Sequence, residues 1–571
     1  MNTGQAKRRN RVHPWRSAAL FLITAVVLMY GVVYPNLAVV VTSFQRAGSW
    51  TLANYRELLS QRIVIEAIVS SLGLSIGTVA LCAIVGVPLA FLFERFTFPG
   101  RRLFAALAAL PLVLPPLVGT VAFIFLFGES GILAHGIQNL FGLDSSPWRL
   151  RGWPALLLFH TYTMYPFFYV LTGAGLRRID ANLAEAARSL GASKPVVLRR
   201  VLLPQLTPSL LAAALLTFMT SMASFSAPLF FGGGVRVLTL EIFTARQRGD
   251  VVIAVTETVI LAIISLGALI FFQRYEGTQK FAAAAMKGAP RRRVSITSGK
   301  ARVLATIVAV LFAVILVAPV ATLFLVSFAR EGSWTTQTFP SAYTTENYQR
   351  LFGDPYSAEV FFNSVTMSAV AAVAALVWSF CIVTLLRRRR EERKLVGEGW
   401  RRLLSLLVLI PWALPGTVVA VSVAEAYGQP SALLGSFVLV GTFWILPVVY
   451  FLRFMPLVVR ALQASMEQLD PTLEEAAGSL GARAWQRFMR VTLPLVWPGA
   501  VAGTLLAFVI ALGEYVASVL VFVPANRPIS IAIASELRDF NLGAAAAYGV
   551  VLIVIISISM FVAGKLERLR G

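Results

Sequence analysis

Glu185-Ala186-Ala187-Arg188-Ser189-Leu190-Gly191 is followed, after nine residues, by Val201-Leu202-Leu203-Pro204. The same pattern returns as Glu475-Ala476-Ala477-Gly478-Ser479-Leu480-Gly481 and Val491-Thr492-Leu493-Pro494, with every spacing equal. Ala and Leu favour helix, each Gly suits a helix C-cap, and each Pro suits the first turn of the next helix. Each copy therefore predicts a short polar helix, ended by a turn and continuous with a following apolar segment. An ordinary helical connector would explain one copy, but two copies with identical spacing argue against it.

Long apolar segments surround both copies. The 571 residues are 57% hydrophobic and 13% charged, and many apolar runs reach the ~20 residues that a membrane-crossing helix needs. Because lipid offers no hydrogen bonds to the backbone, we expect an all-α, polytopic membrane protein. We predict about twelve spans, at residues 17–43, 66–93, 103–127, 153–176, 206–231, 251–273, 303–328, 361–386, 402–426, 434–457, 497–522 and 542–564.

The net charge of +23 is segregated along the chain. Basic residues cluster before the first apolar run and on alternate connections after it, as the positive-inside rule requires. This pattern places the N- and C-termini and both repeated loops in the cytoplasm, beside the lipid bilayer, and makes a nucleic-acid partner unnecessary. The clusters are Lys7 to Arg11, Arg101 and Arg102, Arg177 and Arg178, Arg291 to Arg293, and Arg387 to Arg390.

The two halves of the chain form a direct repeat. Besides the two loops, which are 290 residues apart, Asn54-Tyr55 returns as Asn347-Tyr348. Six spans in each half preserve orientation, so we expect two tandem six-helix units in parallel repeat with a pathway between them. The expected division is a first unit at 1–273 with its loop near 180–204, a basic cytoplasmic linker at 274–302, and a second unit at 303–571 with its loop near 470–494.

The repeated pattern resembles the signature loop of the permeases of binding-protein-dependent ABC importers, and the six-span units extend this resemblance over the whole chain. In that family the loop is a coupling helix that docks on a cytoplasmic ATPase. The resemblance implies two ATPase copies, an extracytoplasmic solute-binding protein and a bacterial inner membrane. The expected coupling residues are Glu185, Ala186, Ala187, Gly191, Glu475, Ala476, Ala477 and Gly481.

Motifs for catalysis are missing from the sequence. It contains no G-x-x-x-x-G-K-S/T phosphate loop and no H-E-x-x-H or C-x-x-C motif. We therefore expect a transport subunit that is not itself an enzyme, with no metal site and no cofactor in this chain. ATP and Mg would bind the partner ATPase.

Polar groups and prolines within the spans are candidates for lining the pathway. An ionisable residue inside a span is costly and is a functional candidate by default, and helices broken by proline often line transport pathways. Either feature also has a purely structural explanation, as a satisfied hydrogen bond or a buried kink. The pathway candidates are Glu514, Tyr515, Ser224, Phe225, Pro115 and Pro415, with His160, Tyr162, Tyr165, Glu257 and Glu425 as weaker ones.

Arg236 and Arg527 precede the last span of each half, where we expect contact with the binding protein. The fused, double-length chain looks most like ferric-iron permeases, so ferric iron is the first expected substrate. Thiamine, phosphonate, polyamine and sulfate permeases share much of the pattern and stay open. A secondary transporter driven by an ion gradient is the alternative class, and a membrane enzyme is a further one.

Overall fold

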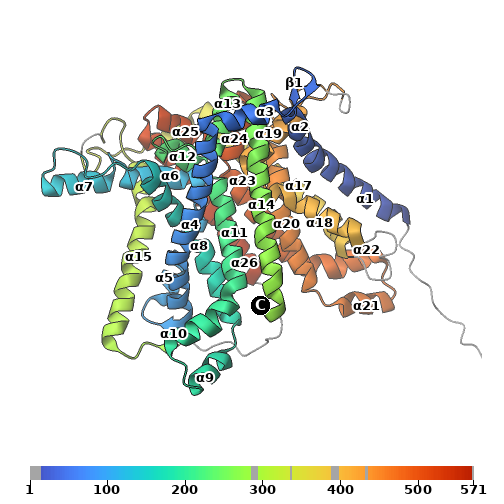
Figure 1. Ribbon diagram of the computed structural model, residues 1–571, viewed down its shortest axis with the longest axis horizontal. Helices are drawn as coiled ribbons and strands as arrows, with labels where there is room; N and C mark the ends of the chain where they lie inside the picture. The colour runs from blue at the N-terminus through green and yellow to red at the C-terminus, as the bar shows by residue number, and fades with distance from the viewer. Residues whose placement is uncertain (1–13, 284–293, 335–336, 388–397, 431–434, 569–571) are drawn as a thin grey trace, which may run out of the picture.

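The computed structural model describes residues 14–283, 294–334, 337–387, 398–430 and 435–568. Most of these residues are helical and the strands are very short (Figure 1), which confirms the all-α prediction. The basic clusters at 7–11, 291–293 and 388–390 and the middle of the expected linker lie outside the described residues. At the edges of that linker, α14 continues to Ala283 and α15 begins at Gly299.

The first half contains fourteen of the helices. They are α1 (Pro14–Leu28), α2 (Tyr34–Ser43), α3 (Ala53–Ser60), α4 (Arg62–Arg95), α5 (Arg101–Leu107), α6 (Pro116–Phe127), α7 (Ile132–Phe141), α8 (Gly152–Arg178), α9 (Ala181–Ser189), α10 (Lys194–Val197), α11 (Leu203–Met222), α12 (Ser226–Phe231), α13 (Leu238–Gln247) and α14 (Val251–Ala283).

The second half repeats this order. Its helices are α15 (Gly299–Val326), α16 (Glu346–Gly353), α17 (Pro355–Arg387), α18 (Glu398–Ala413), α19 (Gly416–Tyr427), α20 (Ile445–Glu467), α21 (Pro471–Ser479), α22 (Ala484–Arg487), α23 (Leu493–Leu512), α24 (Val516–Val521), α25 (Ile529–Arg538) and α26 (Leu542–Arg568).

The described residues also contain short 3-10 and π-helical turns and four strands of two residues each. β1 (Gln45–Arg46) pairs antiparallel with β2 (Ser49–Trp50), next to α3. β3 (Phe96–Thr97) pairs parallel with β4 (Val294–Ser295), which ties the chain just before the second half to the connection between α4 and α5.

Ten helical segments of the described chain are long and apolar enough to cross a membrane, and α18 with α19, bent by 108°, would make an eleventh. α8, which is not among them, has 27 residues and occupies the expected fourth span. The expected third span, 103–127, is broken at Pro111–Pro115 into α5 and α6, and the segment here that is long and apolar enough to cross a membrane is Pro116–Phe141. The expected span 434–457 starts too early, because α20 begins only at Ile445.

The same tertiary hydrogen bonds occur in both halves, which supports the direct repeat beyond sequence similarity. Asn54 Nδ2 donates to the carbonyls of Ser43 and Gln45, and Asn347 Nδ2 donates to those of Ser327 and Ala329. Further along, the backbone N–H of Leu238 donates to Ser71 Oγ and that of Ile529 to Ser364 Oγ. Each half therefore builds the same bundle from the same local rules.

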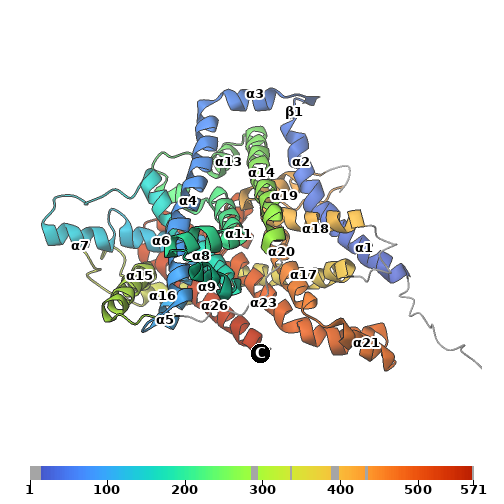
Figure 2. The same ribbon diagram turned by 60° about the horizontal axis from the view of Figure 1, so that its bottom comes forward.

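The first long helix of each half packs on the other half. α2 lies along α19 and α15 lies along α6, while α4, α8 and α11 pack together in the first bundle as α17, α20 and α23 do in the second. The Tyr34 hydroxyl on α2 donates to the Ala426 carbonyl on α19 at 3.4 Å. Figure 2 shows α1 and α2 beside α18 and α19. The two halves are interlocked and share one continuous membrane body.

Candidate functional site

The first repeated loop forms a capped helix that ends in a left-handed turn, as predicted. Asp180 precedes α9 and its Oδ1 accepts the N–H of Asn182 at 3.0 Å, satisfying a free donor of the first turn. At the other end Gly191 has φ +83°, and the N–H of Ala192 donates to the Ala187 carbonyl at 3.0 Å. This is a Schellman ending, which glycine adopts without a steric penalty from Cβ.

The second loop reproduces this geometry closely. Asp470 Oδ1 accepts the N–H of Thr472 at 2.9 Å, and the hydrogen bonds to Thr472 hold the pKa of this carboxyl below its ordinary value. Gly481 has φ +84°, and Ala482 N–H donates to the Ala477 carbonyl at 3.0 Å. Two loops 290 residues apart thus present the same helix and the same turn.

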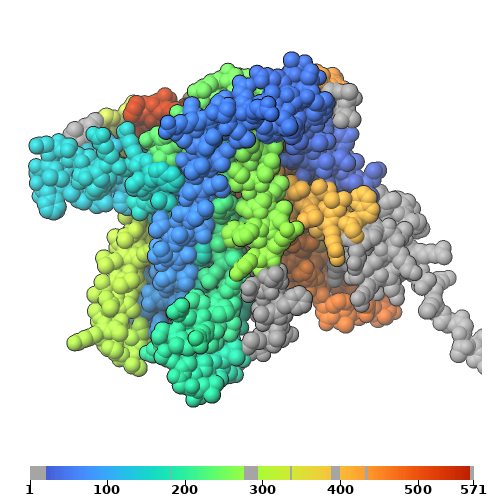
Figure 3. Space-filling view, viewed as in Figure 1, coloured from blue at the N-terminus to red at the C-terminus, as the bar shows by residue number. Residues whose placement is uncertain are grey.

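Both loops lie at one end of the molecule (Figure 1), and the segment around α9 projects from that end in the space-filling view (Figure 3). On α9, Glu185 and Ala186 are exposed and Ala187 is half-buried, and on α21, Glu475, Ala476 and Ala477 follow the same order. Two residues that sequence reasoning missed stand out here. Leu190 and Leu480, directly before the turn glycines, are each 89% exposed. The sequence indicated them, because a Leu precedes the Gly in both copies of the pattern.

From α10 and α22 onward, continuous helical backbone joins each loop to a long helix. After α10 a π-helical turn, Leu198–Leu202, runs directly into α11, and after α22 the turn Phe488–Thr492 runs into α23. In the second half the Thr492 hydroxyl also donates to Glu474 Oε1 at 2.6 Å. A displacement of α10 or α22 would therefore reach α11 or α23 through helical backbone.

At their far ends, α11 and α23 break at equivalent places. α11 ends at Met222 and α12 starts at Ser226, while α23 ends at Leu512 and α24 starts at Val516. The expected spans 206–231 and 497–522 are thus each two helices separated by three residues. The freed carbonyl of Ser224 accepts the Thr239 hydroxyl at 2.7 Å, and that of Glu514 accepts the Ser530 hydroxyl at 2.8 Å.

The two breaks meet between the halves. The rings of Phe225 and Tyr515 have centroids 5.8 Å apart and an interplanar angle of 59°, and both residues are buried. Gly513 lies against Pro115 of the other half so closely that a Cβ on Gly513 would be 2.8 Å from the Cβ of Pro115. The structure therefore brings five of the six predicted pathway residues to the two breaks and the contact across them: Ser224, Phe225, Glu514, Tyr515 and Pro115.

Beside this contact the two halves carry different polar groups. In the second half Glu514 Oε2 lies 3.2 Å from Arg453 Nε, and Glu514 Oε1 accepts the N–H of Ala517 at 2.9 Å. In the first half Ser224 Oγ lies 2.9 Å from His160 Nε2. Arg453 was not among the residues selected from the sequence, although a charge inside an apolar run was a visible signal.

The remaining pathway candidate, Pro415, is the buried residue that precedes α19, as Pro115 precedes α6. Pro415 is next to Gly416, against which the Arg453 guanidinium packs. Both prolines thus stand directly before the second helix of a broken span.

α13 and α25 lie at the end of the molecule opposite α9 and α21 (Figure 1), and Arg236 and Arg527 belong to the connections that lead to these two helices. Arg236 Nη1 pairs with Glu241 Oε1 at 3.2 Å. The guanidinium of Arg527 contacts the Tyr356 hydroxyl and stacks over the ring, with Cζ 5.2 Å from its centroid. Both arginines are therefore oriented by a neighbour on the same surface.

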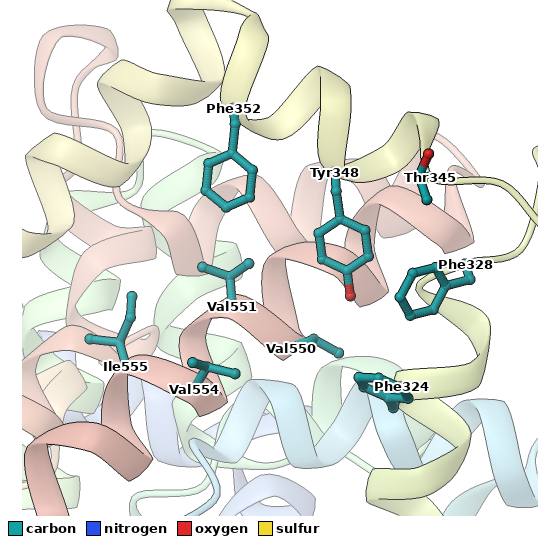
Figure 4. Close-up of a pocket in the computed structure, with 9 residues that line it drawn as sticks. All are labelled: Phe324, Phe328, Thr345, Tyr348, Phe352, Val550, Val551, Val554 and Ile555. Carbon is teal, nitrogen blue, oxygen red and sulfur yellow. The ribbon is translucent and has the colours of Figure 1, made fainter.

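A groove of about 560 Å³ lies elsewhere, between α15, α16 and α26 (Figure 4). It is lined by apolar side chains with Thr345 and Tyr348, and contains none of the predicted pathway residues. It is therefore not part of the contact between the two breaks.

Comparison with known proteins bears on the whole chain. The family model described as "binding-protein-dependent transport system inner membrane component" matches residues 83–277 and again residues 394–570. The probable ABC transporter permease protein y4fN of Sinorhizobium fredii is 31% identical over 568 residues, which cover 99% of this chain and 98% of y4fN.

Two other relatives are named for substrates. The ferric transport system permease protein FbpB of Actinobacillus pleuropneumoniae is 25% identical over 541 residues, covering 92% of this chain and 75% of FbpB. The probable sulfate transport system permease protein cysT of Chlorella vulgaris is 31% identical over 214 residues, covering 35% of this chain and 76% of cysT.

Proposed function

The chain belongs to the inner-membrane components of binding-protein-dependent transport systems, as a fused form with two copies of the family unit, and from this premise we propose that it is the complete membrane pathway of an ATP-driven importer. A solute released by an extracytoplasmic binding protein would pass between the two halves. The chain itself acts as a transport subunit, and ATP with Mg would be bound and hydrolysed by a separate ATPase. We take residues 1–273 and 303–571 as the two permease units, joined by the linker 274–302.

The observation that carries this proposal is the pair of identical capped loops at one end of the molecule. Each presents a Glu-Ala-Ala helix, a glycine turn and one exposed leucine, and each continues into a helix that reaches the contact between the halves. Two equal docking elements suit two copies of one ATPase. On this proposal the loops and both termini are cytoplasmic, and Arg236 and Arg527 face the binding protein.

The mechanism follows from the connection between the loops and the breaks. Closure of an ATPase dimer would draw the two loops together, and α11 and α23 would carry that movement to Phe225 and Tyr515. Separation of these rings would open the pathway toward the other side, giving alternating access. ATP can shift the equilibrium between the two conformations only to the extent that the ATPase binds ATP more tightly when the permease is in one conformation than in the other.

Ferric iron is the substrate that we propose first. The FbpB relative, named for ferric transport, matches 92% of this chain, whereas the relative named for sulfate matches 35%. Thiamine, phosphonate, polyamine and sulfate are the alternatives within the same machinery. In such a system the binding protein would supply most of the specificity, so the permease needs no iron ligands of its own.

The test is to purify the permease with its neighbouring gene products and reconstitute it in liposomes. We expect an ATPase to copurify and solute uptake to require ATP and the binding protein. Calorimetry of the binding protein with ferric iron, thiamine, 2-aminoethylphosphonate, spermidine and sulfate then assigns the substrate. Uptake that proceeds without an ATPase and responds to an ion gradient would refute the proposal in favour of a secondary transporter.

A further inference from the structure

Arg453 places a guanidinium inside the second bundle, next to the break that contains Glu514. It lies in the middle of α20, and its side chain and that of Glu514 are 18% and 6% exposed. The Glu514–Arg453 pair uses only one edge of the guanidinium, because Glu514 Oε2 faces Nε. The other carboxylate oxygen, Oε1, is taken by the N–H of Ala517.

Another nitrogen of this guanidinium and a hydroxyl on α19 lack hydrogen-bond partners. Among the described residues, buried Arg453 Nη1 has no hydrogen-bond partner, and neither does the hydroxyl of Thr417, a residue that is 0% exposed. Buried donors without partners are uncommon in folded proteins, and each calls for a water, an ion, a ligand or local strain to explain it. An arginine can donate five hydrogen bonds and accept none, so the missing partner of Nη1 must be an acceptor.

The two unpartnered groups lie at the same place, the start of α19. A Cβ on Gly416 would be 1.9 Å from Arg453 Nη1, so the guanidinium packs directly on the first residue of this helix. No side chain of the described residues caps α19. Gly416, Thr417 and Val418 are buried, and their N–H groups cannot be paired within the helix, since the first turn has no preceding carbonyls.

The electrostatics of this place favour an anion. The start of a helix carries a partial positive charge of about half an elementary unit, and Arg453 adds a full one. Glu514 balances the guanidinium from one edge, and both of its carboxylate oxygens are already engaged. Arginine and backbone N–H groups together are the donor set that recognises carboxylate, sulfate and phosphate oxygens.

The first half has no such set of donors at the equivalent described residues. Thr163 stands 290 residues before Arg453, and its hydroxyl donates to the Phe159 carbonyl at 3.0 Å. The helix that corresponds to α19 begins with Pro116, which has no N–H, followed by Leu117. This set of donors therefore occurs in the second half and has no counterpart at the equivalent described residues of the first half. It is not a consequence of the internal repeat.

We propose that Arg453, Thr417 and the start of α19 form a binding site for a single oxyanion. Its occupant is either a free inorganic anion such as phosphate or sulfate, or the oxyanion group of the transported solute. The second source rests on the proposed function, because it requires that solute passes beside Glu514. The site itself requires only the permease.

The first experiment uses the full-length permease alone in nanodiscs, without ATPase or binding protein. Equilibrium binding of radiolabelled phosphate and sulfate should be saturable, with one site per chain. Arg453→Gln should weaken binding by at least about tenfold, as expected for loss of a charged hydrogen bond. Thr163→Ala, the equivalent change in the first half, should leave it unchanged.

Two further variants keep the test valid if Arg453→Gln fails to fold. Gly416→Ala displaces the guanidinium without changing any charge, and Thr417→Val removes one donor at nearly constant volume. Both should lower anion affinity in a permease that elutes as the wild type does from gel filtration. Absence of saturable binding in the wild type, or binding that both variants leave intact, would overturn the proposal and assign the donors to buried water.

Uptake measurements then separate the two sources. If the anion is the solute, its ATP-dependent uptake should fall in Gly416→Ala, and excess solute should displace bound phosphate from the permease. If the anion is a free ion, phosphate should still bind, and the identified solute should not displace it. Uptake of that solute should then be the same in Gly416→Ala as in the wild type. Failure of ATP-driven uptake with intact anion binding would count against the proposed function and leave the site standing.

Discussion

The turn glycines of the two loops allow the docking proposal to be tested through backbone geometry alone. Gly191 and Gly481 have φ near +83° and +84°, and no atom of the described residues lies within 4 Å of where a Cβ would be. Alanine at these positions therefore meets no steric contact and acts only by disfavouring the left-handed conformation, at about 1–2 kcal/mol per site. The altered turn would redirect the exposed leucine and the chain that leads to α10 or α22.

The expected effect on ATPase docking follows from this cost. If the ATPase binds only the left-handed turn, each substitution lowers the apparent affinity of the permease for the ATPase in proportion to the fraction of molecules that keep this turn. A cost of about 1–2 kcal/mol corresponds to a loss of roughly 5- to 30-fold, since 1.4 kcal/mol is a factor of ten. The measurement is a titration of fluorescently labelled ATPase onto permease in nanodiscs, for each single variant and for the double variant. The double variant should lose more than either single one, because the loops are far apart in sequence and are docked separately.

Gly142 provides a matched control at the opposite end of the molecule. It also has a positive φ, +62°, with no described atom within 4 Å of where its Cβ would lie, and it follows the end of α7 as Gly191 follows the end of α9. Gly142→Ala should carry a similar backbone cost and leave ATPase affinity unchanged. Docking of the double variant within about twofold of the wild type would refute the reasoning, and so would an equal loss in Gly142→Ala.

Three other changes test the loops and the central contact. Replacing both Glu185 and Glu475 with Ala should weaken ATPase docking roughly fivefold, as for loss of two modest ion pairs. The melting temperature of the permease should stay the same. Unchanged docking would show that these carboxylates are not part of the coupling surface. Phe225→Ala removes an aromatic pair worth about 0.5–1.5 kcal/mol, so passive solute efflux from preloaded liposomes without ATP should rise roughly 2- to 12-fold, and an unchanged efflux would show that this contact does not close the pathway. Gly513→Ala forces a methyl group against a proline ring of the other half and should destabilise the permease by about 1–3 kcal/mol in thermal unfolding. The control Gly267→Ala, in open space on α14, should have little effect. Equal stability of the two variants would contradict the close contact.

Local sequence signals predicted the loops well, because their determinants are local. A helix-favouring run, a glycine and a proline specify α9, its left-handed turn and the helix that follows, without help from distant residues. The breaks in the third spans were equally visible, since Pro115 and Pro415 cannot donate the hydrogen bond that a continuous helix needs.

The break between α23 and α24 was not predictable from the local sequence, whereas Pro228 in α12 was a local signal for the break after α11, since it cannot donate a hydrogen bond to the carbonyl of Ser224. The freed carbonyls of Ser224 and Glu514 are satisfied by hydroxyls of Thr239 and Ser530. Those partners are 15 and 16 residues away along the chain and are brought close only by folding. For the same reason the partner of Glu514 was missed, since the Arg453 side chain reaches it from another helix.

The interlocking of the first helices has a consequence for biosynthesis. The Tyr34 hydroxyl on α2 bonds a carbonyl on α19 that the ribosome adds 392 residues later. α2 therefore enters the bilayer long before α19 exists, and within the first half it packs on α14. Its packing is completed only when the second half has been made. A chain truncated between the two halves would consequently leave α2 packed on α14 but without α19, however well the first bundle had formed.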